Sequence, residues 1–172
     1  DLTAAYSMFA NEGNYNNLHF VKEIRDKNNN IIYSHTQENK PVFSPETTFL
    51  LTDMLQECAK TGTAKKLDIK DIASKTGTAG DETGNTSAWN ISYSKNYTLS
   101  VWLGNCIGGE KNNLPLSVTG GNQSTLMVSE IFKQIKDIDT HFKKPEGIIK
   151  LDIDKIAYEN EHKLLLSNEF ID

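Results

Sequence analysis

The sequence has 172 residues, 37% of them hydrophobic and 24% charged, which suffices for one good core or a large part of one domain. Its formal net charge of -5 argues against nucleic acid as the main partner, because phosphate binding requires a clustered basic surface. No apolar run approaches the roughly 20 residues that span a bilayer, and no signal peptide opens the chain. The opening Asp1, in place of Met, suggests a fragment or a processed piece.

The beginning of the chain predicts a helix followed by a hairpin. Residues 2–10 are rich in alanine and aromatic residues, and Gly13 is placed to terminate the helix that they predict. Residues 20–25 and 31–34 are strand-like segments on either side of the asparagine-rich spacer 26–30. This pattern predicts a hairpin or a small subsheet, in which the asparagines serve turn geometry.

A helix is predicted next, over residues 44–59, because Ser44 can cap it and Pro45 suits its first turn. The tetrapeptide Lys-Thr-Gly-Thr follows at residues 60–63. Gly62 then stands where a helix commonly ends in the left-handed conformation. This copy of the tetrapeptide is therefore interpreted as a helix end.

The same tetrapeptide recurs at residues 75–78, where it follows a short apolar stretch and is expected to lie on a sheet. Lys75 supplies a fixed positive charge, and Thr76 and Thr78 supply hydroxyl donors. Gly77 lets an extended ligand lie against the strand, whose edge can also pair with a ligand by main-chain hydrogen bonds. The stretch predicts a site for a small anionic substrate. The alternative is a solvated lysine on an edge strand, which the tetrapeptide alone favours.

The following segments predict the rest of the sheet. Residues 79–86 are polar and predict a loop. Residues 88–93 and 98–103 alternate in polarity around a tight turn at residues 95–96, so that with the site strand they predict three antiparallel strands with the core on one face. Apolar residues at helical spacing over 128–138 predict a helix packed on this sheet. The expected fold class is α/β (α+β), an antiparallel sheet flanked by helices.

The cysteines and histidines predict neither a disulfide framework nor a metal site. Cys58 and Cys106 have no neighbours that resemble metal ligands, and the four histidines are scattered without ligand spacing. Cys58 is interpreted as a small buried apolar residue. No cofactor and no metal are expected.

Seven segments together resemble the second half of a penicillin-binding protein transpeptidase domain, in that family's order. They are residues 5–13, 52–55, 61–64, 74–78, 88–89, 101–104 and 119–121. The resemblance is closer to the class A, bifunctional group. It implies a β-lactamase/transpeptidase-like fold, incomplete because the N-terminal part of the domain is missing. Residues 1–147 would be the C-terminal part of the domain, and residues 148–172, with a possible strand at 148–153, an extension of unknown role.

The resemblance also implies an activity. The implied enzyme is a serine D,D-transpeptidase that cross-links peptidoglycan stem peptides by acyl transfer from D-Ala-D-Ala. Such an enzyme is acylated by β-lactams. It would work at the extracytoplasmic face of the bacterial membrane, with its anchor outside this chain. Lys75 resembles the lysine that orients a serine of another motif and attracts the substrate carboxylate. Thr76 and Thr78 resemble the hydroxyls that bind this carboxylate, and Gly77 keeps the strand edge open. The backbone N–H of Thr78 resembles an oxyanion-hole donor, so that Lys75 and Thr78 carry the catalytic roles.

The chain departs from the family because its Ser-x-x-Lys nucleophile motif and its Ser-x-Asn motif should lie upstream, on a missing segment or a companion chain. Ser92 and Lys95 match the first pattern, but a strand puts residues three apart on opposite faces. Residues 94–96 and 15–17 imitate the second motif in turn-like stretches. Asn90 stands where the family has an aromatic residue, and is expected to weaken packing or reflect local repacking without touching the site.

Two other functions remain open. One is a non-catalytic binding or interaction domain with the same scaffold, and the other is a D,D-carboxypeptidase or β-lactam sensor. Covalent labelling by a penicillin discriminates the first from an enzyme.

Overall fold

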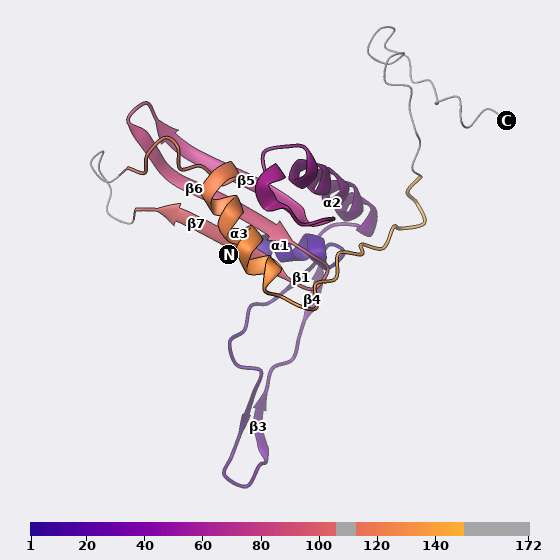
Figure 1. Cartoon of the computed structure of the whole chain (residues 1–172). Coiled ribbons are helices and arrows are strands. Elements are labelled where there is room, and N and C mark those ends of the chain that lie inside the picture. Colours follow the sequence, from indigo (N-terminus) through magenta and orange to yellow (C-terminus); the bar gives the residue numbers. More distant parts are fainter. Residues whose placement is uncertain (106–112, 150–172) are drawn as a thin grey trace, which may run out of the picture.

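The structure is a computed structural model that describes residues 1–105 and 113–149 (Figure 1). Its strands are β1 (Asn14–Asn16), β2 (Glu23–Arg25), β3 (Ile31–Ser34), β4 (Asn39–Pro41), β5 (Ala73–Asp81), β6 (Gly84–Tyr93) and β7 (Thr98–Gly104). Its helices are α1 (Leu2–Ala10), α2 (Pro45–Lys60), the 3₁₀ turn η1 (Lys65–Leu67), the π-helical turn η3 (Gly120–Ser124) and α3 (Thr125–Lys133). Most of the possible strand at residues 148–153 lies outside the described residues.

The central sheet is antiparallel with the order β5-β6-β7, as the sequence predicts. The tight turn between β6 and β7 is also confirmed, since the Ser94 amide donates to the Tyr97 carbonyl oxygen at 2.8 Å. The predicted loop over residues 79–86 is wrong, because β5 continues to Asp81 and β6 begins at Gly84. Polar residues form this end of the ribbon because most of it is exposed, and the buried Asn85 donates to the Leu116 and Val118 carbonyl oxygens.

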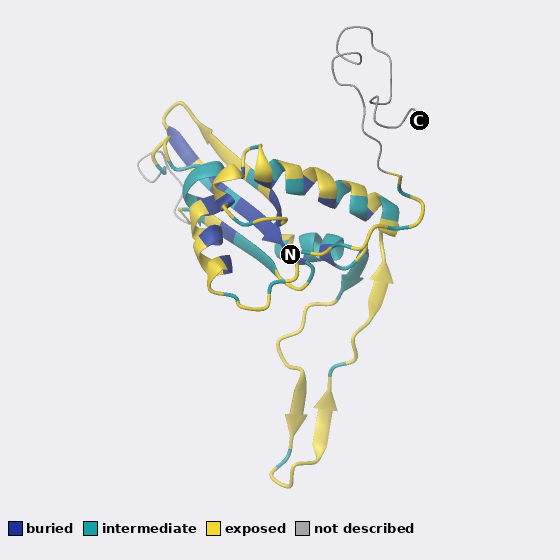
Figure 2. Ribbon diagram, turned by 45° about the vertical axis from the view of Figure 1, so that its right-hand side comes forward, coloured by how far each residue is buried: buried dark blue, intermediate teal, exposed yellow. Residues whose placement is uncertain are grey.

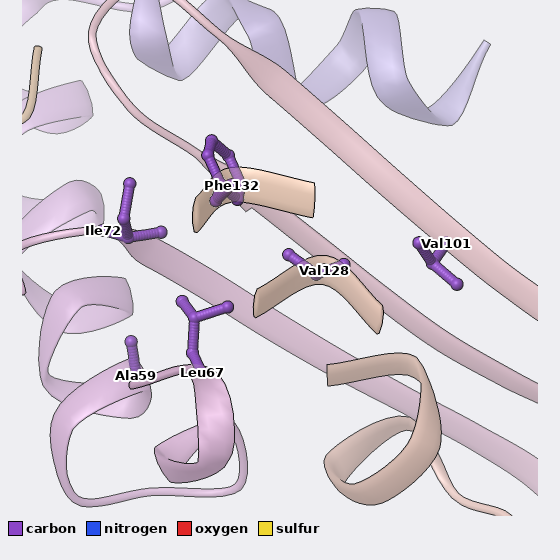
Figure 3. Close-up of a cluster of buried hydrophobic side chains, with 6 residues drawn as sticks. All are labelled: Ala59, Leu67, Ile72, Val101, Val128 and Phe132. Carbon is purple, nitrogen blue, oxygen red and sulfur yellow. The ribbon is translucent and has the colours of Figure 1, made fainter. Parts of the chain in front are cut away.

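Both faces of the sheet are covered, so the prediction of a core on one face alone is wrong. One hydrophobic cluster lies between the sheet and α3, and consists of Ala59, Leu67, Ile72, Val101, Val128 and Phe132 (Figure 3). A second cluster involves α1 on the other face, and consists of Ala10, Leu55, Ala73 and Tyr93. Helix α2 contributes to both, since Leu55 and Ala59 belong to different clusters.

The helix ends follow the sequence at most positions. Ser44 caps helix α2, since its side chain accepts a hydrogen bond from the Thr47 amide. Gly13, in the turn that follows helix α1, has a left-handed φ of 87°. Gly62, however, is not left-handed: its amide donates to the Cys58 carbonyl oxygen at 3.1 Å, and the prediction at this residue is wrong. Helix α3 ends at Lys133, before the predicted residue 138, although residues 135 and 138 still pack against the first cluster.

Residues 14–41 form an arm that projects from the body of the protein (Figures 1 and 2). Its base is the pair β1–β4 and its tip the predicted hairpin β2–β3. The tip turn is held by Asp26, whose side chain accepts from the Asn28 and Asn30 amides, while Asn29 has a φ of 69°. Residues 15–16, expected in a turn-like stretch, belong instead to strand β1. All residues of β2, β3 and β4 are exposed.

Candidate active site

Strand β5 carries the predicted site residues at the edge of the central sheet. Because side chains alternate along a strand, Lys75 and Gly77 share the face of Ala73, whereas Thr76 and Thr78 share the face covered by η3 and α3. The structure therefore brings the four residues of the tetrapeptide to one strand but divides their side chains between two faces.

Lys75 is exposed, and its ammonium donates to the main-chain oxygen of Thr76 at 2.6 Å. Within the described part of the chain, no carboxylate lies within ion-pair distance of this ammonium. Its charge is therefore available to an anionic ligand at the strand edge.

Thr76 links the two copies of the tetrapeptide. Its hydroxyl donates to the Thr63 hydroxyl oxygen at 2.7 Å. The Cys58 sulfur lies 3.5 Å from the same oxygen, and Cys58 is half-buried, so its interpretation as a buried apolar residue is wrong. Sequence reasoning treated residues 60–63 as a helix end alone and missed this contact, although 61–64 was among the segments that carry the resemblance.

Thr78 is held from behind by the double glycine that opens η3. The Gly120 amide donates to the Thr78 hydroxyl oxygen at 3.0 Å. A hydroxyl that accepts one hydrogen bond still has its own hydrogen to donate. Thr78 is therefore a donor available to a ligand, whereas the hydrogen of Thr76 is already engaged with Thr63.

The double glycine allows this close approach. A β-carbon at Gly120 would lie 2.2 Å from the Trp89 carbonyl oxygen and 2.5 Å from that of Gly77, distances that side chains do not tolerate. A β-carbon at Gly121 would lie 2.7 Å from the Thr63 carbonyl oxygen. At Gly77, by contrast, a β-carbon would meet only the Trp89 β-carbon at 3.6 Å, an ordinary contact.

The residues that imitate the missing motifs are engaged elsewhere. Ser92 is fully buried and its hydroxyl donates to the Asn90 side-chain oxygen at 2.7 Å. The Lys95 ammonium contacts a Glu12 carboxylate oxygen at 2.7 Å, and this hydrogen bond and charge hold the pKa of Glu12 below its usual value. Ser94 bonds Asn96 within the turn. The Ser92 hydroxyl and the Lys95 ammonium thus have separate partners, and nothing in this arrangement resembles a serine activated by a lysine.

Of the two alternatives expected at Asn90, weakened packing and local repacking, the structure shows the second. It is fully buried, and its side-chain nitrogen donates to the Thr125 hydroxyl oxygen at 2.8 Å and to the Ser74 hydroxyl oxygen at 3.2 Å. A buried amide is stable when it is hydrogen-bonded in this way. The position is repacked with polar partners.

The described residues provide neither a metal site nor a membrane-spanning helix. Within residues 1–105 and 113–149, no group of three or more His, Cys, Asp or Glu side chains is placed to hold a metal ion. No helix in that part of the chain combines the length and hydropathy needed to cross a membrane. A cavity of about 390 Å³ lies beside Phe9, Thr52, Lys95 and Phe142, and residues 75–78 do not line it. The candidate site is thus a strand edge and not this cavity.

The chain matches known proteins over most of its length. A family model described as the penicillin binding protein transpeptidase domain matches residues 1–137. Penicillin-binding protein 1A/1B of Bacillus subtilis is 32% identical over 168 residues, which are 90% of this chain and 18% of that protein. Penicillin-binding protein 1F of the same organism is 30% identical over 88% of this chain and 21% of its own length. The chain thus spans about a fifth of these curated relatives, which are of class A, as the resemblance implies.

Solved structures show the same fold at low sequence identity. Penicillin-binding protein 1A from Haemophilus influenzae superposes with a TM-score of 0.74 at 17% identity, covering 97% of this chain and 30% of that one. Penicillin-binding protein A from M. tuberculosis, in a ceftriaxone acyl-enzyme complex, has a TM-score of 0.62 at 21% identity, over 76% of this chain and 30% of that one.

Proposed function

The chain belongs to the penicillin-binding protein transpeptidase family, and from this premise we propose that it is the carboxy-terminal part of a serine D,D-transpeptidase. The proposed reaction is acyl transfer from the D-Ala-D-Ala end of one peptidoglycan stem peptide to another. The proposed inhibitors are β-lactams, which acylate the same serine. Residues 1–147 are assigned to the transpeptidase domain, and residues 148–172 form an extension of unassigned role.

The observation that carries the proposal is the arrangement of strand β5. At one sheet edge it offers the exposed ammonium of Lys75, which has no carboxylate partner among the described residues, and the hydroxyl hydrogen of Thr78, with no side chain between them at Gly77. A carboxylate binds best to such charged and hydroxyl donors. The Thr78 amide is proposed as one donor to the oxyanion that develops on the attacked carbonyl. Thr76 serves the substrate carboxylate only if its bond to Thr63 exchanges.

The nucleophile is proposed to lie outside this chain. The chain's own Ser-x-x-Lys match has its serine buried and its lysine paired with Glu12. The Ser-x-x-Lys and Ser-x-Asn motifs would then belong to an upstream segment or a companion chain. The extracytoplasmic membrane surface, where stem peptides occur, is the corresponding location, with the anchor also outside this chain.

Covalent labelling tests the proposal most directly. We would treat this chain alone, and the chain produced together with its upstream coding region, with a fluorescent penicillin and measure intact mass. One adduct on an upstream serine of the longer form alone would support the proposal. If this chain is labelled without its upstream region, Ser92 becomes the first candidate for the nucleophile. If neither form is labelled, a non-catalytic binding domain is favoured.

A substitution then tests the site itself. In the longer form, Lys75→Ala should slow acylation by about 100-fold, because it removes a positive charge from the carboxylate site. Lys70→Ala is the matched control, since the Lys70 side chain is 91% exposed and lies outside the site. Measured acylation rate constants that are equal for the two variants would move the site elsewhere. Acylation by a model peptide releases the terminal D-alanine in either case, so a product in which water and not an amine has taken the acyl group would instead indicate a D,D-carboxypeptidase.

A further inference from the structure

A line of buried polar groups runs behind strand β5, on the face opposite Lys75. It passes from Ser92 and Asn90 in β6, through Thr125 at the start of α3, to Gly120 in η3, and we refer to these four residues as the polar relay. The side chains of Ser92, Asn90 and Thr125 are fully buried. Polar groups at such a depth are costly unless each finds a partner.

The hydrogen bonds of the polar relay all run in one direction. The Ser92 hydroxyl donates to the Asn90 side-chain oxygen at 2.7 Å, and the Asn90 nitrogen donates to the Thr125 hydroxyl oxygen at 2.8 Å. The Thr125 hydroxyl donates to the Gly120 carbonyl oxygen at 2.6 Å. The Gly120 amide finally donates to the Thr78 hydroxyl oxygen at 3.0 Å. Hydrogen bonds that follow one another in this way polarise and strengthen each other.

The direction follows from which atoms can donate. In the observed orientation the Asn90 nitrogen donates to the Thr125 hydroxyl oxygen, which leaves the Thr125 hydroxyl hydrogen for the Gly120 carbonyl oxygen. The same carbonyl oxygen also accepts from the Thr125 backbone N–H, so Thr125 holds Gly120 by two hydrogen bonds.

We propose that Asn90 and Thr125 are positioning residues that hold Gly120 against strand β5 and thereby orient the Thr78 hydroxyl hydrogen toward the carboxylate of the bound substrate. This inference rests on the proposed function. Thr78 accepts from the Gly120 amide, which leaves its own hydrogen to donate to a ligand. Thr76, two residues earlier on the same face, donates its hydrogen to Thr63 instead.

Because Gly120 packs so close to the sheet, a small shift of this residue should change the position of the Thr78 hydroxyl. Its α-carbon packs over the Trp89 and Gly77 carbonyl oxygens with no room for a β-carbon. Loss of the Thr125 hydroxyl leaves the Gly120 carbonyl oxygen with its bond from the Thr125 backbone N–H, and therefore loosens the segment whose amide sets the Thr78 hydroxyl. Binding of a carboxylate should weaken, while the core around α3 remains packed.

The test uses the full-length protein and one β-lactam in two forms. The first form has a free carboxylate, and the second is its methyl ester. For each compound we would measure the acylation rate constant of Thr125→Val relative to wild type. Valine has the shape of threonine but neither accepts from Asn90 nor donates to Gly120. We expect about tenfold slower acylation by the carboxylate compound, the loss typical of a hydrogen bond to a charged group, and little change with the ester. Thr125→Ser, which keeps the hydroxyl, should restore the wild-type rate.

Ser129→Ala is the matched control, because Ser129 is a buried residue of the same helix whose hydroxyl bonds the Leu67 carbonyl oxygen and not the polar relay. It should leave both rate constants unchanged. If Thr125→Val does not fold, Thr125→Ala removes the same hydroxyl with less bulk near the core. Equal slowing with carboxylate and ester would make the role structural and overturn the inference while leaving the proposed function intact. Failure of wild type to react with either compound would overturn the proposed function and this inference together.

Discussion

The central sheet and the arm are both antiparallel, yet they are stabilised very differently. The sheet has hydrophobic clusters on both faces and fully buried polar groups between its strands and α3. Most of the arm is exposed (Figure 2). Its exposed large apolar side chains include Phe20, Ile31 and Ile32. Two-stranded ribbons are marginally stable on their own, so the arm relies on its turn and main-chain bonds.

The difference shows what a strand needs in order to carry a site. Alternation and a turn are enough to form the arm, but its strands β2, β3 and β4 are exposed along their whole length. In β5, two site residues are held by a contact from outside the strand: Thr76 by Thr63, and Thr78 by Gly120. Precise placement of donors comes from packing on the rear face of the strand.

The largest contrast is expected in stability. Phe132→Ala should lower the free energy of unfolding by about 4 kcal/mol, because it empties a fully buried position in the cluster under α3. Ile32→Ala in the arm should cost less than about 0.5 kcal/mol, since Ile32 is 66% exposed. Denaturant unfolding followed by tryptophan fluorescence measures both. A similar loss for the two variants would mean that the arm is covered in the protein in solution.

A smaller effect should distinguish the two sides of β5. Gly120→Ala should destabilise the sheet by roughly 2 kcal/mol and slow acylation, because the new methyl group overlaps the Trp89 and Gly77 carbonyl oxygens. Gly77→Ala should leave stability nearly unchanged, as its methyl group makes an ordinary contact, and should slow acylation alone. Thermal unfolding and penicillin labelling of both variants separate these outcomes. Loss of stability from Gly77→Ala would contradict the assignment of its edge to the ligand.

The smallest effect concerns pH. Burial raises the pKa of Tyr93 to about 12, although its hydrogen bond with Thr52 opposes the shift. Because the folded pKa lies above the unfolded value, this stabilisation is complete below pH 10 and is lost as pH rises toward 12. Between about pH 10 and 11 the loss should be about 1 kcal/mol. Unfolding measured over this range should show a shallower fall in Tyr93→Phe, and an equal fall in both proteins would assign the effect to other groups.

The sequence predicted those features that depend on local patterns. Alternation located β6 and β7, and turn residues located the hairpin tip. Composition misled at residues 79–86, where polar residues form strands that are exposed at most positions, and where the buried Asn85 is satisfied by main-chain oxygens. Two contacts of the site join residues that are far apart in the chain. One is the hydrogen bond from Thr76 to Thr63, and the other is the close packing of Gly120 against the Gly77 main chain. Periodicity carries no information about such pairs, and they could not be predicted from it.

The buried bond between Asn90 and Thr125 also limits how this protein can diverge. Replacing either residue alone by an apolar one removes a buried hydrogen-bond partner of the other, whereas replacing both removes donor and acceptor together. Asn90 keeps a second acceptor in Ser74, and Thr125 keeps its own acceptor in Gly120, so one replacement leaves neither side chain without a partner. The energetic effects of substitutions at the two positions should still be non-additive, because loss of one residue lowers the cost of losing the other.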